Sequence, residues 1–150
     1  MGSEHTRSKV PASLAQSAGF LLSRSARLLQ ERNELVLEPL KLSLRELGAM
    51  RIIDDEGPLT QQALGERHNI DRTTVVQIID GLEKRDLLTR VTNEQDRRSN
   101  LLYLTPRGKK TLTAALKLVN KQQESFLAPL DQSERDAFFH SLNKLLQHNA

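Results

Sequence analysis

The chain has 150 residues, of which 37% are hydrophobic and 3% are aromatic. That length fits one domain, or a small domain with an oligomerisation element, and the low apolar content predicts a core shared with a partner chain. Cysteine is absent, which excludes disulfides, thiolate metal sites and thiol catalysis.

The net charge of +3 is concentrated in the middle third of the sequence. Residues 60–110 hold ten Lys or Arg against seven Asp or Glu, whereas the remaining residues hold twelve of each. This local excess is typical of a surface that binds a polyanion. No apolar run reaches the roughly 18 residues that span a bilayer, and the segment MGSEHTRSKV lacks the apolar stretch of a signal peptide. We therefore expect a cytoplasmic protein with no membrane partner.

The N-terminal part is predicted to be a flexible tail, residues 1–12, followed by a long amphipathic helix over 13–37. Apolar residues recur there at roughly helical spacing, from Leu14 to Val36. Pro39 ends or bends this helix. We assign residues 13–42 to an N-terminal dimerisation helix region.

Residues 43–86 predict three helices. Ser43 and Glu46 form a capping-box pattern that starts the first, and DDEGP ends it. Thr60 and Asp71 are capping residues for two shorter helices, and Asn69 between them tolerates a left-handed backbone. The last of these helices has one apolar side, formed by Val75, Ile78, Ile79 and Leu82. Two short helices joined by a tight turn predict a helix-turn-helix.

The runs LLTRVT (87–92) and NLLYLT (100–105) flank the polar segment NEQDRRS and predict a β-hairpin. Thr105 and Pro106 then fit the N-cap and first position of a new helix. A last helix follows the capping pattern at Asp131–Glu134 and carries an apolar stripe. We assign 43–110 to a DNA-binding domain and 111–150 to C-terminal dimerisation helices, and we expect the terminal helices to pack on a second copy.

The stretch from Pro58 to Lys110 resembles the winged helix-turn-helix of MarR-type transcriptional regulators. The most specific pieces are TVVQIIDGLEKRDLL and DRRSNLLYLTPRG. The resemblance implies a mainly α fold: a winged helix-turn-helix with long N- and C-terminal dimerisation helices and one small β-hairpin wing. It also implies a homodimeric repressor of a palindromic operator, released when a small molecule, often an aromatic anion, binds between the dimer helices and the DNA-binding lobe.

The sequence departs from the family pattern at several positions. His68 stands where the family usually has Leu, so the first helix of the motif is expected to pack more loosely. Asn69 and Asp86 replace glycines but tolerate left-handed backbone. The remaining departures are Gly65 for a residue such as Ala, and Val76 and Gln77 for Thr and Arg. Those on the recognition helix change the DNA sequence that it would read, not the fold.

The candidate DNA-reading residues lie at the start of the recognition helix, because only that part reaches base edges in the major groove. They are Arg72, Thr73, Thr74 and Gln77. Arg can bind guanine and Gln can pair with adenine, while Thr can donate to phosphate or contact a thymine methyl. The alternative is an ordinary solvated helix face.

At the wing tip, Arg97 and Arg98 could enter the minor groove, whose negative potential attracts arginine. Asp96 is expected to hold the Arg98 guanidinium in a bidentate pair. The alternative is a solubilising hairpin turn. The candidate phosphate contacts are Lys84, Arg85, Arg90 and Arg107, together with Lys109 and Lys110.

Other chemistries find no support in the sequence. The four histidines form no i, i+4 pair, so we expect no metal site, and no nucleotide-binding or nucleophile motif predicts an enzyme or a cofactor. Residues that would contact an effector cannot be assigned, although Arg24, Arg27 or Arg51 could meet an anion. A second hypothesis stays open: a winged-helix protein-interaction or anti-repressor module that does not read DNA.

Overall fold

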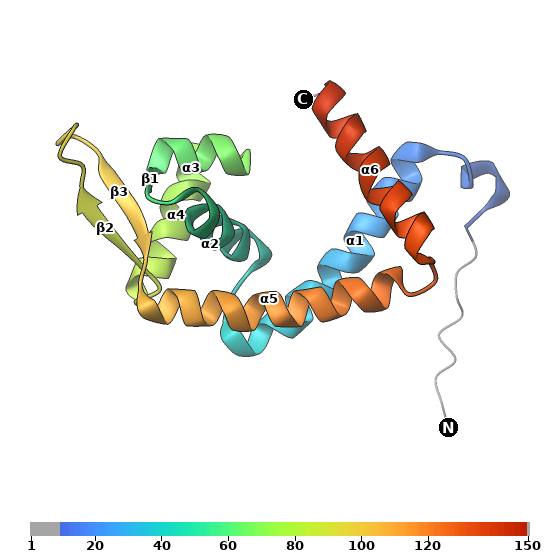
Figure 1. The fold of residues 1–150 in the computed structure, drawn as a ribbon, viewed down its shortest axis with the longest axis horizontal. Helices are drawn as coiled ribbons and strands as arrows, with labels where there is room; N and C mark the ends of the chain where they lie inside the picture. Colours follow the sequence, from blue (N-terminus) through green and yellow to red (C-terminus); the bar gives the residue numbers. More distant parts are fainter. Residues whose placement is uncertain (1–9, 150) are drawn as a thin grey trace.

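The computed structural model describes residues 10–149, so most of the tail predicted over 1–12 lies outside the described residues. Residues 44–104, here called the winged lobe, occupy one end of the molecule (Figure 1). The ends of the long helices occupy the other end. The elements in chain order are η1 Ala12–Leu14, α1 Ala18–Leu37, η2 Glu38–Leu40, α2 Leu44–Glu56, β1 Leu59–Thr60, α3 Gln61–His68, α4 Arg72–Lys84, β2 Leu88–Thr92, β3 Asn100–Leu104, α5 Pro106–Leu127 and α6 Gln132–Asn149.

The first long helix, α1, begins five residues later than the sequence predicted. Ser17 is its N-cap, and the Ser17 side chain accepts a hydrogen bond from the Phe20 N–H at 3.4 Å. The residues before it form the short 3-10 helix η1 instead. At the other end α1 stops at Leu37, and Pro39 lies in η2 as a helix-ending proline should.

Side-chain caps begin the helices of the winged lobe where the sequence placed them. Ser43 and Glu46 form the reciprocal capping box of α2, and Thr60 and Asp71 cap α3 and α4. Asn69 lies between α3 and α4 in left-handed conformation, with φ 52°. The helix-turn-helix prediction is confirmed.

The wing is a three-stranded antiparallel sheet in the order β1-β3-β2, not a two-stranded hairpin. Strands β2 and β3 are the predicted hairpin, with Leu88 opposite Leu104. The additional strand β1 pairs Leu59 with Leu102. Two residues are too few to show an alternating pattern, which is why the sequence did not predict this strand.

The core lies inside the winged lobe and along the first half of α5. Its largest fully buried side chains come from the end of α1, from α2, α3 and α4, and from both hairpin strands: Leu37, Met50, Leu64, Val75, Ile79, Leu82, Leu88 and Leu102. By contrast, Leu37 is the only residue of α1 that is buried, and α6 has none. The apolar stripes of these two helices are therefore left largely uncovered in one chain. No helix within residues 10–149 combines the length and apolar character needed to cross a membrane.

Candidate nucleic-acid interface

Helix α4 has one face in the core and the opposite face in solvent. The buried face carries Val75, Ile78, Ile79 and Leu82. Of the predicted reading residues, Arg72, Thr73 and Gln77 are exposed, and Thr74 is half-buried. Three of the four predicted reading residues are therefore accessible to a ligand, and the fourth, Thr74, is part of the N-terminal cap of the helix.

Thr74 belongs to the cap of α4. Its N–H donates to Asp71 Oδ1 at 2.9 Å, and its hydroxyl donates to Asp71 Oδ2 at 2.6 Å. The hydroxyl bond is the largest cause that holds the pKa of the Asp71 carboxyl below its ordinary value, and the bond from the Thr74 N–H is the next, because both bonds stabilise the charged form. The Thr74 O–H is therefore already used as a donor, which leaves its oxygen as an acceptor and its methyl group for a ligand.

The turn at the wing tip is built by its own short side chains. Asn93 Oδ1 accepts from the Gln95 N–H at 3.1 Å, and the Asp96 carbonyl accepts from the Ser99 N–H at 2.9 Å. Asp96 Oδ1 accepts from the backbone N–H of Arg98 at 3.1 Å. Asp96 thus shapes the turn through the backbone of Arg98, in place of the expected pair with its guanidinium. Short polar side chains in turns commonly bond to the backbone two residues on, and this local bond holds Asp96 in the turn.

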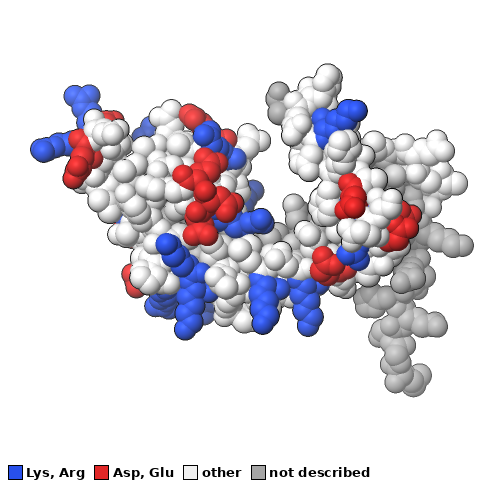
Figure 2. All heavy atoms as spheres, viewed as in Figure 1, with Lys and Arg blue, Asp and Glu red and all other residues white. Residues whose placement is uncertain are grey.

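Arg97 and Arg98 are both exposed. Figure 2 shows basic side chains projecting from the end of the wing, beyond the body of the lobe. The structure therefore places two cations on a hydrogen-bonded turn at the outer end of the hairpin.

The predicted phosphate contacts divide into two groups. Lys84 and Arg107 are exposed, as are Lys109 and Lys110. Arg90, on β2, instead has its guanidinium paired with two carboxylates of α4: Asp80, and Glu83 at 2.5 Å. Arg85 is paired with Glu46 of α2. Both paired arginines connect elements of the lobe, which a sequence does not reveal because their partners lie seven or more residues away.

A cavity of about 890 Å³ lies between the helix-turn-helix and the wing. Arg72 from the start of α4 and Arg98 from the wing tip both line it, together with Asn69 and Asn93. The structure thus brings residues that are 26 positions apart in the sequence to one hollow with hydrogen-bond donors on both walls. The arginines and asparagines of this surface can donate to the oxygens of a phosphate backbone, while the carboxylates of Glu66, Asp71 and Asp96 line the same hollow.

A second cavity, of about 1090 Å³, lies between α1 and the start of α2. Its charged lining residues are Arg27, Glu31, Glu34, Glu38, Lys41, Arg45 and Glu46. Of the arginines that the sequence suggested for an anion, only Arg27 lines it. No group of three or more His, Asp or Glu side chains within the described part of the chain is arranged to hold a metal ion.

Two capped helices around a left-handed turn, followed by a small sheet with a projecting hairpin, define a winged helix-turn-helix protein. The pattern of the MarR family matches residues 42–99, and this chain belongs to that family. A candidate transcriptional regulator of the hcr operon of Thauera aromatica is 30% identical over 103 residues, which are 69% of this chain and 62% of that protein.

Solved structures agree with this assignment. The transcriptional repressor CouR, bound to a 23-mer DNA duplex, is 27% identical with a TM-score of 0.85 over 92% of this chain and 98% of that chain. BpsR of Bordetella bronchiseptica, whose DNA binding is regulated by 6-hydroxynicotinic acid, is 25% identical with a TM-score of 0.77 over 85% of this chain and 96% of that chain.

Proposed function

We propose that the protein is a homodimeric repressor that binds a palindromic double-stranded operator in the cytoplasm and releases it on binding a small-molecule effector. The observation that carries the DNA-binding part is the shared hollow of Arg72 and Arg98. A recognition helix and a wing that face the same hollow can contact a major groove and the adjacent minor groove of one duplex. The DNA-bound structure of CouR supports this function.

Within this function, each exposed residue has a defined role. Arg72 and Gln77 would contact base edges, and Thr73 would donate to phosphate. Arg97 and Arg98 would enter the minor groove, while Lys84 and Arg107 would contact phosphates and release counterions. The paired Arg85 and Arg90 would support the reading surface and not contact DNA.

The homodimer is supported by the apolar residues that one chain leaves exposed. Seven of them lie on α1 and α6: Leu21, Leu22, Leu28, Leu35, Phe139, Leu145 and Leu146. A patch of this kind on a small protein marks an interaction site. A two-fold dimer through these helices would present two recognition helices to successive major grooves, which is the geometry that a palindromic operator requires.

The effector is proposed to be an aromatic anion that binds in the cavity between α1 and α2. The regulation of BpsR by an aromatic carboxylic acid supports this class. Lys41 and Arg45 supply cations beside Arg27, but four carboxylates line the same cavity. An anion would therefore bind only where it lies nearer to the three cations than to the carboxylates.

The test is a selection of bound duplexes from a random-sequence pool, followed by affinity measurements on the winner and on scrambled DNA across a salt series. We expect a palindromic winner preferred by about a thousandfold or more. Arg98→Ala should reduce both the affinity and the salt dependence. The matched control is Lys117→Ala, which removes one exposed cation on α5, outside both the candidate reading residues and the proposed α1 and α6 interface, and should change neither. Uniform weak binding by the wild-type protein would refute the proposal and favour a protein partner.

A further inference from the structure

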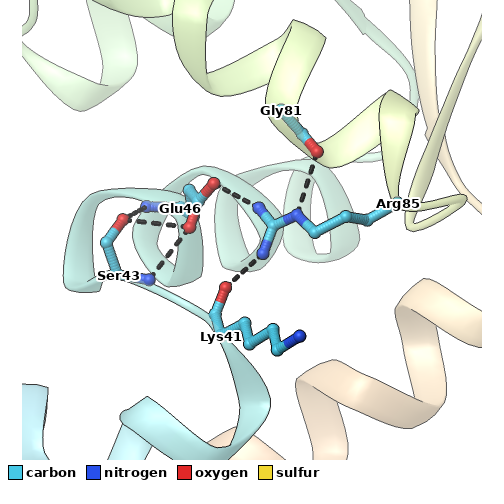
Figure 3. Close-up of polar contacts among 5 residues, drawn as sticks. All are labelled: Lys41, Ser43, Glu46, Gly81 and Arg85. Carbon is cyan, nitrogen blue, oxygen red and sulfur yellow. Dashed lines mark hydrogen bonds and ion pairs between the residues drawn. The ribbon is translucent and has the colours of Figure 1, made fainter.

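Arg85 lies at the C-terminal end of the recognition helix, and its guanidinium contacts three separate parts of the chain (Figure 3). Its Nε donates to the Gly81 carbonyl of α4 at 3.0 Å. One terminal nitrogen donates to the Lys41 carbonyl and the other to Glu46 Oε1. Only 29% of the Arg85 side chain and 17% of the Glu46 side chain are exposed. Three of the five guanidinium N–H groups, one on each nitrogen, are therefore already used inside the molecule.

The first of these partners, Lys41, lies on the connection between the dimerisation helix and the winged lobe. It follows η2 and precedes α2, and it has a left-handed backbone with φ 51°. This conformation is unfavourable for a non-glycine residue and persists only where its surroundings hold it. The bond from Arg85 to the Lys41 carbonyl is one such restraint.

The second partner, Glu46, is itself fixed by the start of α2. Its Oε2 accepts from the Ser43 N–H at 2.9 Å and from the Ser43 hydroxyl at 3.1 Å, while its Oε1 accepts from Arg85. One carboxylate thus joins the capping box of α2 to the end of α4, as the dashed lines in Figure 3 show. The Arg85 guanidinium therefore contacts the connection at Lys41, before α2, and at Glu46, in the first turn of α2.

We propose that Arg85 is a positioning residue that sets the placement of the recognition helix relative to α1, and through it the spacing of the two recognition helices in the dimer. This inference rests on the proposed function. A palindrome is bound well only when both helices meet successive grooves at the correct separation. Because Lys41 is where the chain passes from α1 to the lobe, a change in its backbone would displace the whole lobe and not one side chain.

The role predicts different effects on one lobe and on the dimer. Replacing Arg85 leaves Arg72, Thr73 and Gln77 in place, so binding to a half-site duplex should be preserved. Binding to the complete palindrome should weaken, because the two lobes are no longer held at one separation. Since no phosphate contact is lost, the salt dependence should be unchanged.

The experiment compares the wild-type protein with Arg85→Ala and Arg85→Lys on the selected palindrome, on its half-site, and on palindromes whose spacer is one or two base pairs shorter or longer. We expect Arg85→Ala to lose about tenfold on the optimal palindrome. Its affinities for palindromes of different spacer length should become more nearly equal. Its half-site affinity should stay the same. Arg85→Lys should behave similarly, because an ammonium group does not reproduce the three-way contact of a guanidinium.

Two further variants complete the test. Lys84→Ala removes the neighbouring exposed cation and should lower the salt slope by about one without changing the spacer preference. Glu46→Gln removes the charged partner of Arg85, while Gln still completes the capping box with Ser43. It should reproduce the flattened spacer preference, and it carries the test if Arg85→Ala does not fold.

The possible failures are distinguishable. If the wild-type protein shows no sequence preference, the proposed function fails and the inference falls with it. If the wild-type protein prefers one spacer and both Arg85 variants keep that preference, only the inference is overturned. A parallel loss on half-site and palindrome, with a smaller salt slope, would show that Arg85 contacts phosphate.

Discussion

The imidazole of His68 on α3 lies directly over Gly48 on α2. A Cβ at Gly48 would come within 2.7 Å of His68 Nε2, which donates to the Arg45 carbonyl at 2.8 Å. The sequence predicted that His68 would loosen the first helix of the motif. The structure instead shows a specific contact, in which the absence of a side chain on α2 makes room for the ring on α3.

We predict that Gly48→Ala is close to neutral in the wild-type protein, because the new methyl group displaces the ring and breaks a hydrogen bond worth about 1 kcal/mol, while Ala gains about 1 kcal/mol over Gly as a helix former. In a His68→Ala background the same change should stabilise the protein by about 1 kcal/mol, since no ring is displaced. Urea unfolding of the four proteins measures both effects. An equal effect of Gly48→Ala in the two backgrounds would show that the ring is not the obstacle.

Gly108 makes a closer contact, at the start of α5. A Cβ there would lie 1.9 Å from the Leu87 carbonyl oxygen, which is backbone and cannot rotate away. We expect Gly108→Ala to cost about 3 kcal/mol or more, enough to reduce the folded yield. Gly19→Ala is the matched control, because nothing lies within 4 Å of its Cβ position. Its effect on the melting temperature should be slight, and similar melting curves for the two variants would contradict the prediction.

The helices and their starts could be predicted because each cap depends on residues only three positions apart. Ser43 with Glu46 and Asp71 with Thr74 are such pairs, and each side-chain bond is present in the structure. The turn at Asn69 was also predictable, since few residue types tolerate its conformation. Local chemistry was sufficient for these features.

Features that depend on distant partners could not be predicted. Arg85 and the Lys41 carbonyl are 44 residues apart, and an arginine that points into the molecule looks the same in a sequence as one that points into solvent. The contact between Gly108 and Leu87 and the two-residue strand β1 likewise arise only when the lobe has folded. The sequence therefore indicated candidate reading residues, which the structure places on an exposed helix face, but not the residues that hold that face in place.

The cap of α4 should make stability depend on acid pH. Because Thr74 lowers the pKa of the Asp71 carboxyl, the charged cap stabilises the protein at pH values above the ordinary pKa of 3.8, and this contribution is lost as the pH falls through the lower native value. Asp71→Asn keeps a good capping residue that does not titrate. We expect the difference in melting temperature between the wild-type protein and this variant to shrink as the pH falls below about 4. A difference that is constant from pH 7 to pH 2 would contradict this.

The dimer itself can be tested on α6, where Leu145 and Leu146 are 54% and 68% exposed. The double variant Leu145→Glu/Leu146→Glu places two charges on a surface that the proposed interface would bury, which costs several kcal/mol in association. We expect sedimentation at micromolar concentration to show a monomer, and affinity for the palindrome to fall to that for a half-site. Val91→Glu is the control, since it replaces an exposed apolar side chain of β2 and should leave the oligomeric state unchanged. If the double variant sediments like the wild-type protein, α6 is not part of the interface and the exposed leucines of α1 must be tested in its place.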